Sequence, residues 1–185
     1  HSFDTKFRRL IKDQQNKQRL AFEHKIANKY RKQSNDSFAW LAIFDIDHFK
    51  RVNDQYGHVC GDEVLLKLSQ IMKSFFRSSD LLFRFGGEEF VVILEPIPHE
   101  MAHRTLEIFR GEIEKSVFPL AKKITISGGY IKITDADYPM AFIERADQAL
   151  YYAKNHGRNN ICNYEFLVNS GALPKAKALG SVDLF

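Results

Sequence analysis

Arg84-Phe85-Gly86-Gly87-Glu88-Glu89-Phe90 is the stretch on which the interpretation of this chain depends. It separates two apolar runs, 81–83 and 90–94, and a glycine pair between two runs of β-forming residues predicts a β-hairpin. The two glycines carry no side chains, so a ligand can approach the backbone closely. The two glutamates follow at the mouth of an apolar strand, where a carboxylate needs a partner or a bound cation. The alternative is a surface hairpin with two solvated glutamates.

The chain before this hairpin predicts one strand and one helix. A continuous apolar run over 38–44 is typical of a buried strand, and it ends in Asp45-Ile46-Asp47. We expect a loop at Asn53-Asp54 and Gly57, and then a helix that begins after Gly61-Asp62. One face of that helix carries the apolar residues Val64, Leu65, Leu68, Ile71, Met72 and Phe75.

The chain after the hairpin alternates between helical and strand patterns. Residues 100–117 have a helical pattern, and 124–133 predict a strand in which Gly128-Gly129 indicates a bulge or a close contact. Another helix starts at Pro139 and ends before Gly157, and 160–164 form a short last strand. The order β-α-β-β-α-β-α-β predicts an α+β fold with a mixed, mostly antiparallel sheet covered by helices.

Three segments are expected along the 185 residues. Residues 1–34 are polar with short apolar stripes at helical spacing, which indicates a helical connector that either packs on the domain or pairs with its copy in a dimer. Residues 35–165 form the domain itself. The tail, 166–185, is rich in small residues and is expected to be loosely held.

Composition limits the possible partners and location. The formal net charge of +4 and the pI of about 9.0 come without a long basic block, so nucleic-acid binding is not favoured. Cys60 and Cys162 form no metal or disulfide pattern and suggest a reducing compartment. No apolar run reaches the roughly 18 residues of a membrane span. We expect a cytoplasmic domain, and because the chain opens with His1, a fragment of a longer protein that could itself be membrane-anchored.

Several scattered groups would suit one ligand. The hard oxygen ligands that Mg²⁺ or Mn²⁺ requires are offered by Asp45, Asp47, Glu88 and Glu89. Lys154 and Arg158 offer positive charge for phosphate oxygens. Asp62 can accept hydrogen bonds from the N–H groups of guanine, and Asn53 can donate toward its O6 or N7. Metal, phosphate and guanine groups together describe a GTP site.

Three ordered motifs resemble those of one enzyme family. The stretch 45–58, Asp-Ile-Asp-His-Phe-Lys-Arg-Val-Asn-Asp-Gln-Tyr-Gly-His, followed by Gly61-Asp62, resembles the first signature of GGDEF-domain diguanylate cyclases. Residues 84–90 resemble their name-giving motif in its GGEEF form. Lys154 with Gly157-Arg158-Asn159 resembles their closing signature. The resemblance covers roughly residues 36–164.

The resemblance implies a fold, an activity and an assembly. The fold would be like the palm of nucleotide cyclases and polymerases, with a βαββαβ core. The activity would be the condensation of two GTP into cyclic di-GMP with loss of pyrophosphate. Because one domain holds one GTP, catalysis would need a homodimer. An upstream sensor domain would precede this fragment.

The resemblance also implies roles for single residues, with Mg²⁺ or Mn²⁺ as cofactor. The divalent metal would be held by Asp45, the Ile46 carbonyl, Glu88 and Glu89, and the carboxylates would be the catalytic groups. Guanine would be bound by Asn53 and Asp62. Phosphates would be held by Lys154, Arg158, backbone N–H groups near His48 and Phe49, and the space at Gly86 and Gly87. Asp47 and Lys50 match the motif with a structural or supporting role.

Arg77-Ser78-Ser79-Asp80 matches the inhibitory RxxD site of the family, where cyclic di-GMP would bind as product and inhibitor. Arg110 could supply a second arginine from the next helix. A helix-end charge pair is the alternative for this motif. The alternative for the whole domain is a non-catalytic receptor for cyclic di-GMP or GTP.

One motif departs from the family pattern. Members usually begin with Asp-x-Leu-Thr-Gly-Leu-x-Asn-Arg, and here only Arg19-Leu20-Ala21-Phe22 resembles its end. The departure leaves the role of residues 1–34 open.

Overall fold

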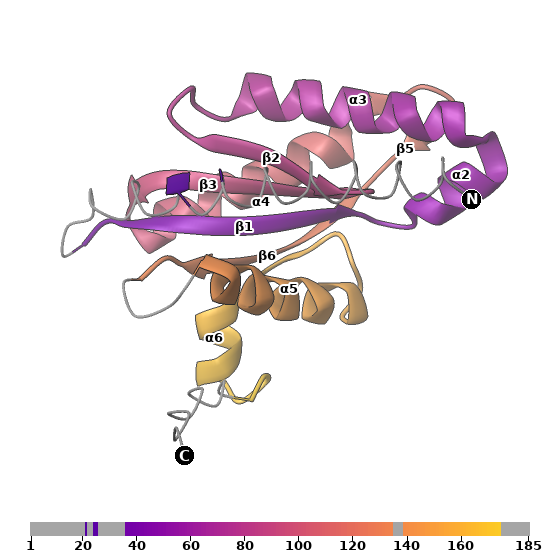
Figure 1. The fold of residues 1–185 in the computed structure, drawn as a ribbon. Coiled ribbons are helices and arrows are strands. Elements are labelled where there is room, and N and C mark those ends of the chain that lie inside the picture. The colour runs from indigo at the N-terminus through magenta and orange to yellow at the C-terminus, as the bar shows by residue number, and fades with distance from the viewer. Residues whose placement is uncertain (1–20, 22–23, 26–35, 135–138, 175–185) are drawn as a thin grey trace, which may run out of the picture.

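The computed structural model describes residues 21, 24–25, 36–134 and 139–174, and the elements of this part of the chain are shown in Figure 1. The strands are β1 (Phe38–Ile46), β2 (Leu81–Gly86), β3 (Glu89–Ile97), β4 (Val117–Phe118), β5 (Lys122–Lys123), β6 (Ile126–Lys132) and β7 (Ile161–Asn163). The helices are α2 (Phe49–Tyr56), α3 (His58–Phe75), α4 (His99–Lys115), α5 (Pro139–Asn155) and α6 (Tyr164–Asn169).

The main sheet has five strands in the order β2-β3-β1-β6-β7. Its neighbours are antiparallel except for β6 and β7, which run parallel. β4 and β5 form a separate two-stranded ribbon that the sequence patterns did not predict. The predicted α+β fold with a mixed, mostly antiparallel sheet is confirmed.

β1 is the central strand, and it is buried on both faces. Ala42 and Phe44 belong to the core under α3 and α4, whereas Leu41 and Ile43 belong to the core under α5. Successive side chains of a strand point to opposite faces, so a strand between two helical layers must be apolar at every position. Figure 1 shows this arrangement, with α3 and α5 on opposite sides of β1.

The turn of the central hairpin falls at Gly87 and Glu88, as the glycine pair predicts. Gly87 has φ +43°, in the left-handed region that favours glycine. The register of β2 and β3 shifts between Arg84 and Gly86, so Phe85 occupies a bulge. A bulge next to a turn twists the strand end and redirects the side chains that follow.

Gly128 and Gly129 mark a close contact and not a bulge, because β1 and β6 pair without a register shift. A Cβ at Gly129 would lie 2.1 Å from the carbonyl oxygen of Ala146 and 2.3 Å from the backbone nitrogen of Leu150. Helix α5 therefore packs with its backbone directly against β6. The position tolerates no side chain unless the helix moves.

The expected loop at Asn53-Asp54 and Gly57 is wrong for its first two residues. Residues 49–56 form α2, whose Phe49 and Val52 are buried three residues apart, and only Gly57 lies between α2 and α3. Gly57 has φ +85° and donates its N–H to the Asn53 carbonyl, which ends α2 sharply. Because α3 then begins at once, Gly61 and Asp62 lie inside its first turns and not before it.

The two ends of the chain fit the expected segments only in part. Helix α6 buries Leu167, so the expected domain boundary near residue 165 falls inside a packed helix. Ala21, His24 and Lys25 are helical, and the Lys25 ammonium lies 5.6 Å from the centre of the Phe83 ring. The remaining residues of 1–34, and the tail after residue 174, lie outside the described residues.

No helix in the described ranges combines the length and apolarity that a membrane span requires.

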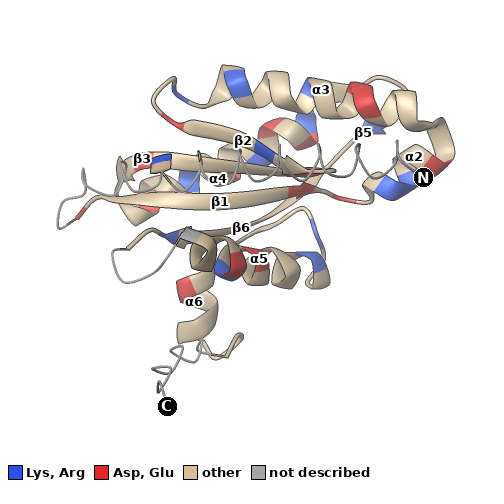
Figure 2. Cartoon of the chain, in the orientation of Figure 1, with Lys and Arg blue, Asp and Glu red and all other residues tan. Residues whose placement is uncertain are grey.

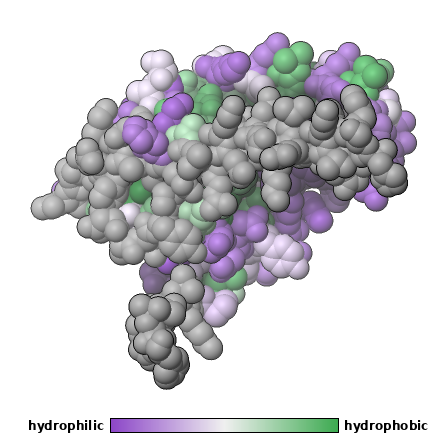
Figure 3. Space-filling view, in the orientation of Figure 1, coloured by the Kyte–Doolittle hydropathy of each residue, from purple (hydrophilic) through white to green (hydrophobic). Residues whose placement is uncertain are grey.

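The outer surface of α3 carries two exposed apolar side chains, Val59 and Leu66, which are 76% and 61% exposed. Figure 3 shows hydrophobic atoms at the surface over this helix, set among hydrophilic ones. Single exposed apolar residues of this kind are ordinary on a folded domain.

The contact at Gly129 predicts a large effect of one methyl group. We expect Gly129→Ala to lower the free energy of unfolding by at least about 1–3 kcal/mol, because backbone atoms of α5 must move to make room. The matched control is Gly111→Ala in α4, where an added Cβ meets no atom within 4 Å. That variant should be neutral or stabilising by up to about 1 kcal/mol. Urea unfolding of both variants measures the difference, and equal stabilities would contradict this packing.

Candidate active site

The sheet itself brings the predicted acidic residues together. Asp45, near the end of β1, pairs with Glu89 of β3 on one side and with Ser127 of β6 on the other. Glu88 precedes Glu89 in the hairpin turn. Figure 2 shows acidic residues at this end of β1, close to the start of α2. Residues far apart in sequence therefore meet at one sheet end because of strand register.

Lys154, in the last turn of α5, adds a positive charge to this cluster. Its ammonium lies 2.8 Å from Oδ2 of Asp45, and the Asp45 side chain is only 7% exposed. The predicted phosphate ligand and the predicted metal ligand are thus direct neighbours. A charge-assisted contact of this kind keeps a buried carboxylate ionised.

The three carboxyl groups have raised pKa values for a shared reason. Burial is the largest cause for Asp45, Glu88 and Glu89, and it raises each pKa above the ordinary 3.8 of Asp or 4.5 of Glu. Repulsion from the ionised Asp45 raises the pKa of both glutamates further. Lys154 opposes the rise at all three groups. The cluster therefore holds more negative charge than its one lysine neutralises, which is the setting in which a cation binds.

Asp147 adds a fourth acidic group that the sequence patterns did not reveal. It lies on α5 and raises the pKa values of Asp45 and Glu89 by repulsion. Its spacing of seven residues from Lys154 is the signal that could have found it, because residues two helical turns apart share a face.

Asp47 is a buried connector, 5% exposed, and its carboxylate holds three elements together. Oδ1 accepts a hydrogen bond from the Ser127 hydroxyl at 2.6 Å, and Oδ2 accepts from the Thr125 hydroxyl at 2.8 Å. Oδ2 also accepts from the Asn159 backbone N–H at 3.0 Å. With three hydrogen bonds from this chain, Asp47 occupies the supporting position that the resemblance gives it.

The turn after α5 holds an unusual backbone. Arg158 and Asn159 have φ values of +61° and +45°, a region that non-glycine residues rarely adopt, directly after Gly157 at +102°. Two contacts hold this turn: Asp47 accepts the Asn159 N–H, and Arg110 donates to the Asn159 side-chain oxygen at 2.7 Å. The backbone that carries the predicted phosphate ligand Arg158 is thus fixed from two sides.

The predicted guanine pair sits where α2 meets α3. A Cβ at Gly61 would lie 1.9 Å from Oδ1 of Asn53, so the Asn53 amide rests directly on the first turns of α3. Asp62 is the next residue and is exposed. The absence of a side chain at position 61 is what lets the Asn53 amide pack against α3 one residue before Asp62.

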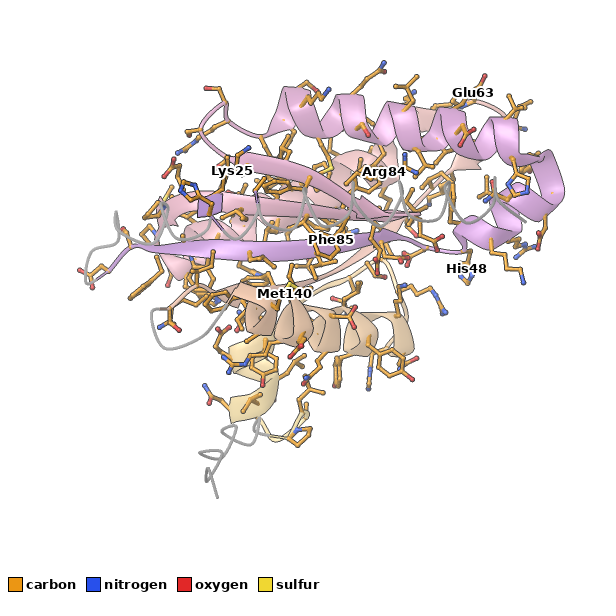
Figure 4. The ribbon with its side chains drawn as sticks, viewed as in Figure 1. Lys25, His48, Glu63, Arg84, Phe85 and Met140 are labelled. Carbon is orange, nitrogen blue, oxygen red and sulfur yellow. The ribbon has the colours of Figure 1, made fainter. Side chains whose placement is uncertain are left out.

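The remaining predicted phosphate contacts border open space. His48 precedes α2 with φ +57°, and Figure 4 shows it at the same end of the sheet as the β1 terminus. No atom lies within 4 Å of a Cβ built at Gly86 or at Gly87. Arg84 donates to the Gly87 carbonyl at 2.7 Å and 3.1 Å, so the hairpin turn is braced although its surroundings are open.

Comparison with known proteins fits this geometry. The sequence profile described as "Diguanylate cyclase, GGDEF domain" matches residues 15–160, which is more than half of the chain. The chain belongs to the GGDEF family.

Curated relatives and solved structures of the family are similar over most of this chain. Diguanylate cyclase DgcP of Pseudomonas aeruginosa is 43% identical over 126 residues, which are 65% of this chain and 18% of that protein. Diguanylate cyclase A of Treponema denticola is 40% identical over 140 residues, which are 74% of this chain and 36% of that protein. This chain therefore spans between about a fifth and about a third of these two relatives.

Solved GGDEF domains share the fold. The active GGEEF domain of a diguanylate cyclase from Vibrio cholerae is 35% identical, with a TM-score of 0.68, over 78% of this chain and 92% of that chain. The GGDEF domain of DgcB from Caulobacter crescentus, solved in complex with c-di-GMP, is 32% identical, with a TM-score of 0.65, over 70% of this chain and 79% of that chain. The palm-like fold implied by the motifs is thereby confirmed.

The sequence predicted a divalent cation at Asp45, the Ile46 carbonyl, Glu88 and Glu89. Within the described ranges, no three His, Cys, Asp or Glu side chains converge as metal ligands. A set made of Asp45, Glu88 and the Ile46 carbonyl needs no third acidic side chain. The excess negative charge at Asp45 and the glutamates supports this set.

The RxxD motif forms one wall of a separate pocket. Asp80 accepts the Arg77 backbone N–H at 3.0 Å and the Glu95 backbone N–H at 2.9 Å, so its carboxylate ties the α3–β2 loop to β3. In the part of the chain that the structure describes, Arg77 makes no ion pair with Asp80. The pocket, of about 200 Å³, also contacts α4 through Met101 and Thr105.

The structure directs Arg110 away from this pocket. Its guanidinium pairs with Glu107 at 3.0 Å and with Glu114 at 2.9 Å, and it also donates to Asn159. The suggestion that Arg110 supplies a second arginine beside Arg77 is therefore replaced by a role in holding the Arg158–Asn159 turn. The pattern misled because Arg110 lies on a different face of α4 from Met101 and Thr105.

The raised pKa values predict how a divalent cation changes stability with pH. Carboxyls whose pKa is raised on folding bind protons more tightly when folded, so they lower stability as pH rises through and above the ordinary carboxyl range. Mg²⁺ should relieve this repulsion and raise Tm at neutral pH, and the gain should shrink as pH falls and the three carboxyls protonate.

Thermal unfolding with and without Mg²⁺ across pH measures this gain. Asp45→Asn should lose it, whereas Glu112→Gln, an exposed carboxylate on α4, should keep it. A gain that stays constant into the acid range would contradict cation binding at these carboxylates.

Proposed function

We propose that this GGDEF domain is a diguanylate cyclase, which condenses two GTP into cyclic di-GMP and releases pyrophosphate. The observation that carries the proposal is the meeting of Asp45, Glu89 and Lys154 at one sheet end, with a 2.8 Å contact between lysine and aspartate. The names of the curated relatives and of the Vibrio cholerae domain support the same activity.

Each group of residues has a part in placing GTP. Asn53 and Asp62 bind the guanine edge, and the Asp62 carboxylate accepts N–H hydrogens that adenine lacks, so the site favours GTP over ATP. Lys154 and Arg158 bind the terminal phosphates, assisted by backbone N–H groups at His48 and Phe49. The open backbone at Gly86 and Gly87 receives the α-phosphate, and the braced hairpin keeps Glu88 and Glu89 beside it.

The carboxylates of this chain gather the cation that the reaction needs. Asp45, Glu88 and the Ile46 carbonyl would hold Mg²⁺ or Mn²⁺, with Glu89 as a further neighbour. Such an ion, when bound, neutralises charge on the α-phosphate and lowers the pKa of the attacking 3′-hydroxyl. Before the nucleotide binds, the Lys154 ammonium pairs with the Asp45 carboxylate. The remaining rate enhancement comes from the positioning of the two reacting groups by the fold.

The assembly follows from the single nucleotide site of each domain. The attacking hydroxyl comes from a second GTP on a facing domain, so the active form is a two-fold homodimer. The facing surface includes the open hairpin turn, where an added Cβ at Gly86 or Gly87 meets no atom within 4 Å. If the dimer is weak, activity per chain falls on dilution.

The direct test is incubation of the chain with GTP and Mg²⁺, followed by separation of the nucleotides. Wild type should yield cyclic di-GMP and pyrophosphate, with activity per chain declining on dilution. Glu88→Gln and Asp45→Asn should lose at least about a hundredfold of turnover, because each removes a charge that acts on the reacting phosphate. Glu112→Gln is the matched control. Full turnover in either active-site variant would overturn the metal assignment. An absence of product from wild type would contradict the enzyme and favour the alternative, a non-catalytic receptor for cyclic di-GMP or GTP.

Gly61 tests the guanine site without removing a ligand. Gly61→Ala must displace Asn53, whose Oδ1 would lie 1.9 Å from the new methyl group. We expect KM for GTP to rise by about tenfold, equivalent to the roughly 1.4 kcal/mol of one weakened hydrogen bond, with a smaller change in kcat. Steady-state kinetics measures this, with Gly111→Ala as the control for an added helix methyl. An unchanged KM in Gly61→Ala would remove Asn53 from the substrate site.

Product inhibition is the second part of the proposal, and the held carboxylate of Asp80 favours it. Cyclic di-GMP bound at Arg77 and Asp80 would restrain the loop that enters β2 and so the hairpin that carries Glu88. Arg77→Ala should weaken product binding by about tenfold or more through a lost charge-assisted contact, while initial GTP turnover changes little. Calorimetric titration with cyclic di-GMP measures this. Equal affinities in wild type and Arg77→Ala would exclude the site.

A further inference from the structure

A second pocket lies at the opposite end of β1 from the cluster of Asp45 and Lys154. Its volume is about 450 Å³, within the range of small-molecule sites. Its lining comes from the start of β1, the end of β6, β7, α4 and α6. Figure 1 shows α6 toward the end of the sheet at which β1 begins, whereas α2 lies at the end at which β1 terminates.

The family profile ends at residue 160, so α6 lies beyond the matched domain. Glu165 and Phe166 of α6 both line the pocket. These residues therefore lie outside the part of the chain that the profile matches, and the nucleotide chemistry proposed above uses none of them.

The pocket has aromatic walls. Phe38 and Trp40 come from β1, and Phe166 comes from α6 with 68% of its surface exposed. The Phe38 ring already attracts a cation, because the Lys132 ammonium lies 4.3 Å from its centre. Aromatic faces of this kind bind ammonium groups through the ring quadrupole.

The pocket also holds a carboxylate whose direct hydrogen-bond donors are neutral. The Glu165 oxygens accept from the Lys132 backbone N–H at 2.9 Å and from the Asn163 amide at 2.8 Å, and both donors are neutral. In the described part of the chain, no lysine or arginine forms an ion pair with Glu165. Burial raises the pKa of this carboxyl, and the hydrogen bonds and the charge of Lys132 oppose the rise only in part. A half-buried carboxylate of this kind gains from a further cation placed beside it.

Three other titratable residues line the pocket. Asp36 adds a second carboxylate at the edge, Lys132 directs its ammonium at Phe38, and the His99 ring, whose pKa is lowered by burial, lies 3.0 Å from the Tyr130 hydroxyl. Two carboxylates would repel phosphate, so a nucleotide does not fit. The volume is far larger than a metal ion needs, and in the described ranges no trio of acidic, histidine or cysteine side chains converges there.

We propose that this pocket binds a small organic ammonium ion, with its positive group at Glu165 and Asp36 and its apolar body against Phe38, Trp40 and Phe166. The proposal does not depend on the diguanylate cyclase activity, and its failure would leave that proposal unchanged. The body of the ligand can be aromatic or aliphatic, since the ammonium group is the shared chemistry.

The test is calorimetric titration of the whole chain with phenethylammonium and with 1,4-diaminobutane. 2-Phenylethanol and phenylacetate are the neutral and anionic controls of similar size. We expect saturable binding of at least one ammonium probe and at least tenfold weaker binding of both controls. Equal binding of 2-phenylethanol would mean an apolar pocket only, and an absence of saturable ammonium binding at millimolar concentrations would overturn the proposal.

Variants separate Glu165 from general charge effects. Glu165→Gln keeps an oxygen for the Lys132 N–H but removes the negative charge, and it should weaken ammonium binding at least tenfold. Glu112→Gln removes an exposed carboxylate elsewhere on α4 and should leave binding unchanged. If Glu165→Gln does not fold, Asp36→Asn and Phe166→Ala carry the test, because both residues are exposed, and each should weaken binding several-fold. Unchanged affinity in the folded variants would contradict the assignment.

Discussion

The carboxylate of Asp47 is the point on which the arrangement of the active site depends. It accepts hydrogen bonds from Thr125 and Ser127 on the β6 side and from the backbone of Asn159 after α5. These contacts fix the end of β1, and with it Asp45, relative to the turn that carries Arg158. Buried carboxylates are tolerated when both of their oxygens accept hydrogen bonds, and here that requirement joins three segments that are distant in sequence. The metal side and the phosphate side of the site are therefore held in register by a residue that the proposal does not place on substrate.

The carboxylates near Asp47 carry more negative charge than the neighbouring lysine neutralises. Asp45, Glu88, Glu89 and Asp147 face one nearby ammonium, that of Lys154, and burial raises the pKa values of the first three. A domain that placed these groups together for stability alone would gain little, because repulsion and desolvation oppose folding. The imbalance makes sense if a cation and a polyphosphate complete the site. Fold stability and substrate binding are then linked through the same carboxylates.

The sequence predicted the strands of the main sheet and its mostly antiparallel character, because both rest on strong local patterns. An apolar run ending in Asp45-Ile46-Asp47 and a glycine pair between β-forming runs leave few other arrangements. The sequence-based predictions failed where packing and backbone contacts determine the local structure. Helix α2 was missed because Asn53, Asp54 and Gly57 are typical of turns, yet buried Phe49 and Val52 make 49–56 helical. The strained turn at Arg158 and Asn159, and the contact that Arg110 makes with it, have no signal in the sequence beyond Gly157.

Hydrogen exchange at the Asn159 amide tests most directly whether Asp47 holds the turn at Arg158 and Asn159 to the end of β1. In wild type this amide should be protected. In Asp47→Ala it should exchange at close to the unprotected rate while the amide of Ile43, within β1, stays protected. Asp47→Asn should retain protection, because its amide oxygen can replace Oδ2 and its N–H₂ can donate to the Ser127 hydroxyl. If Asn159 stays protected in Asp47→Ala, or if Ile43 loses protection with it, the turn is not held in the way described.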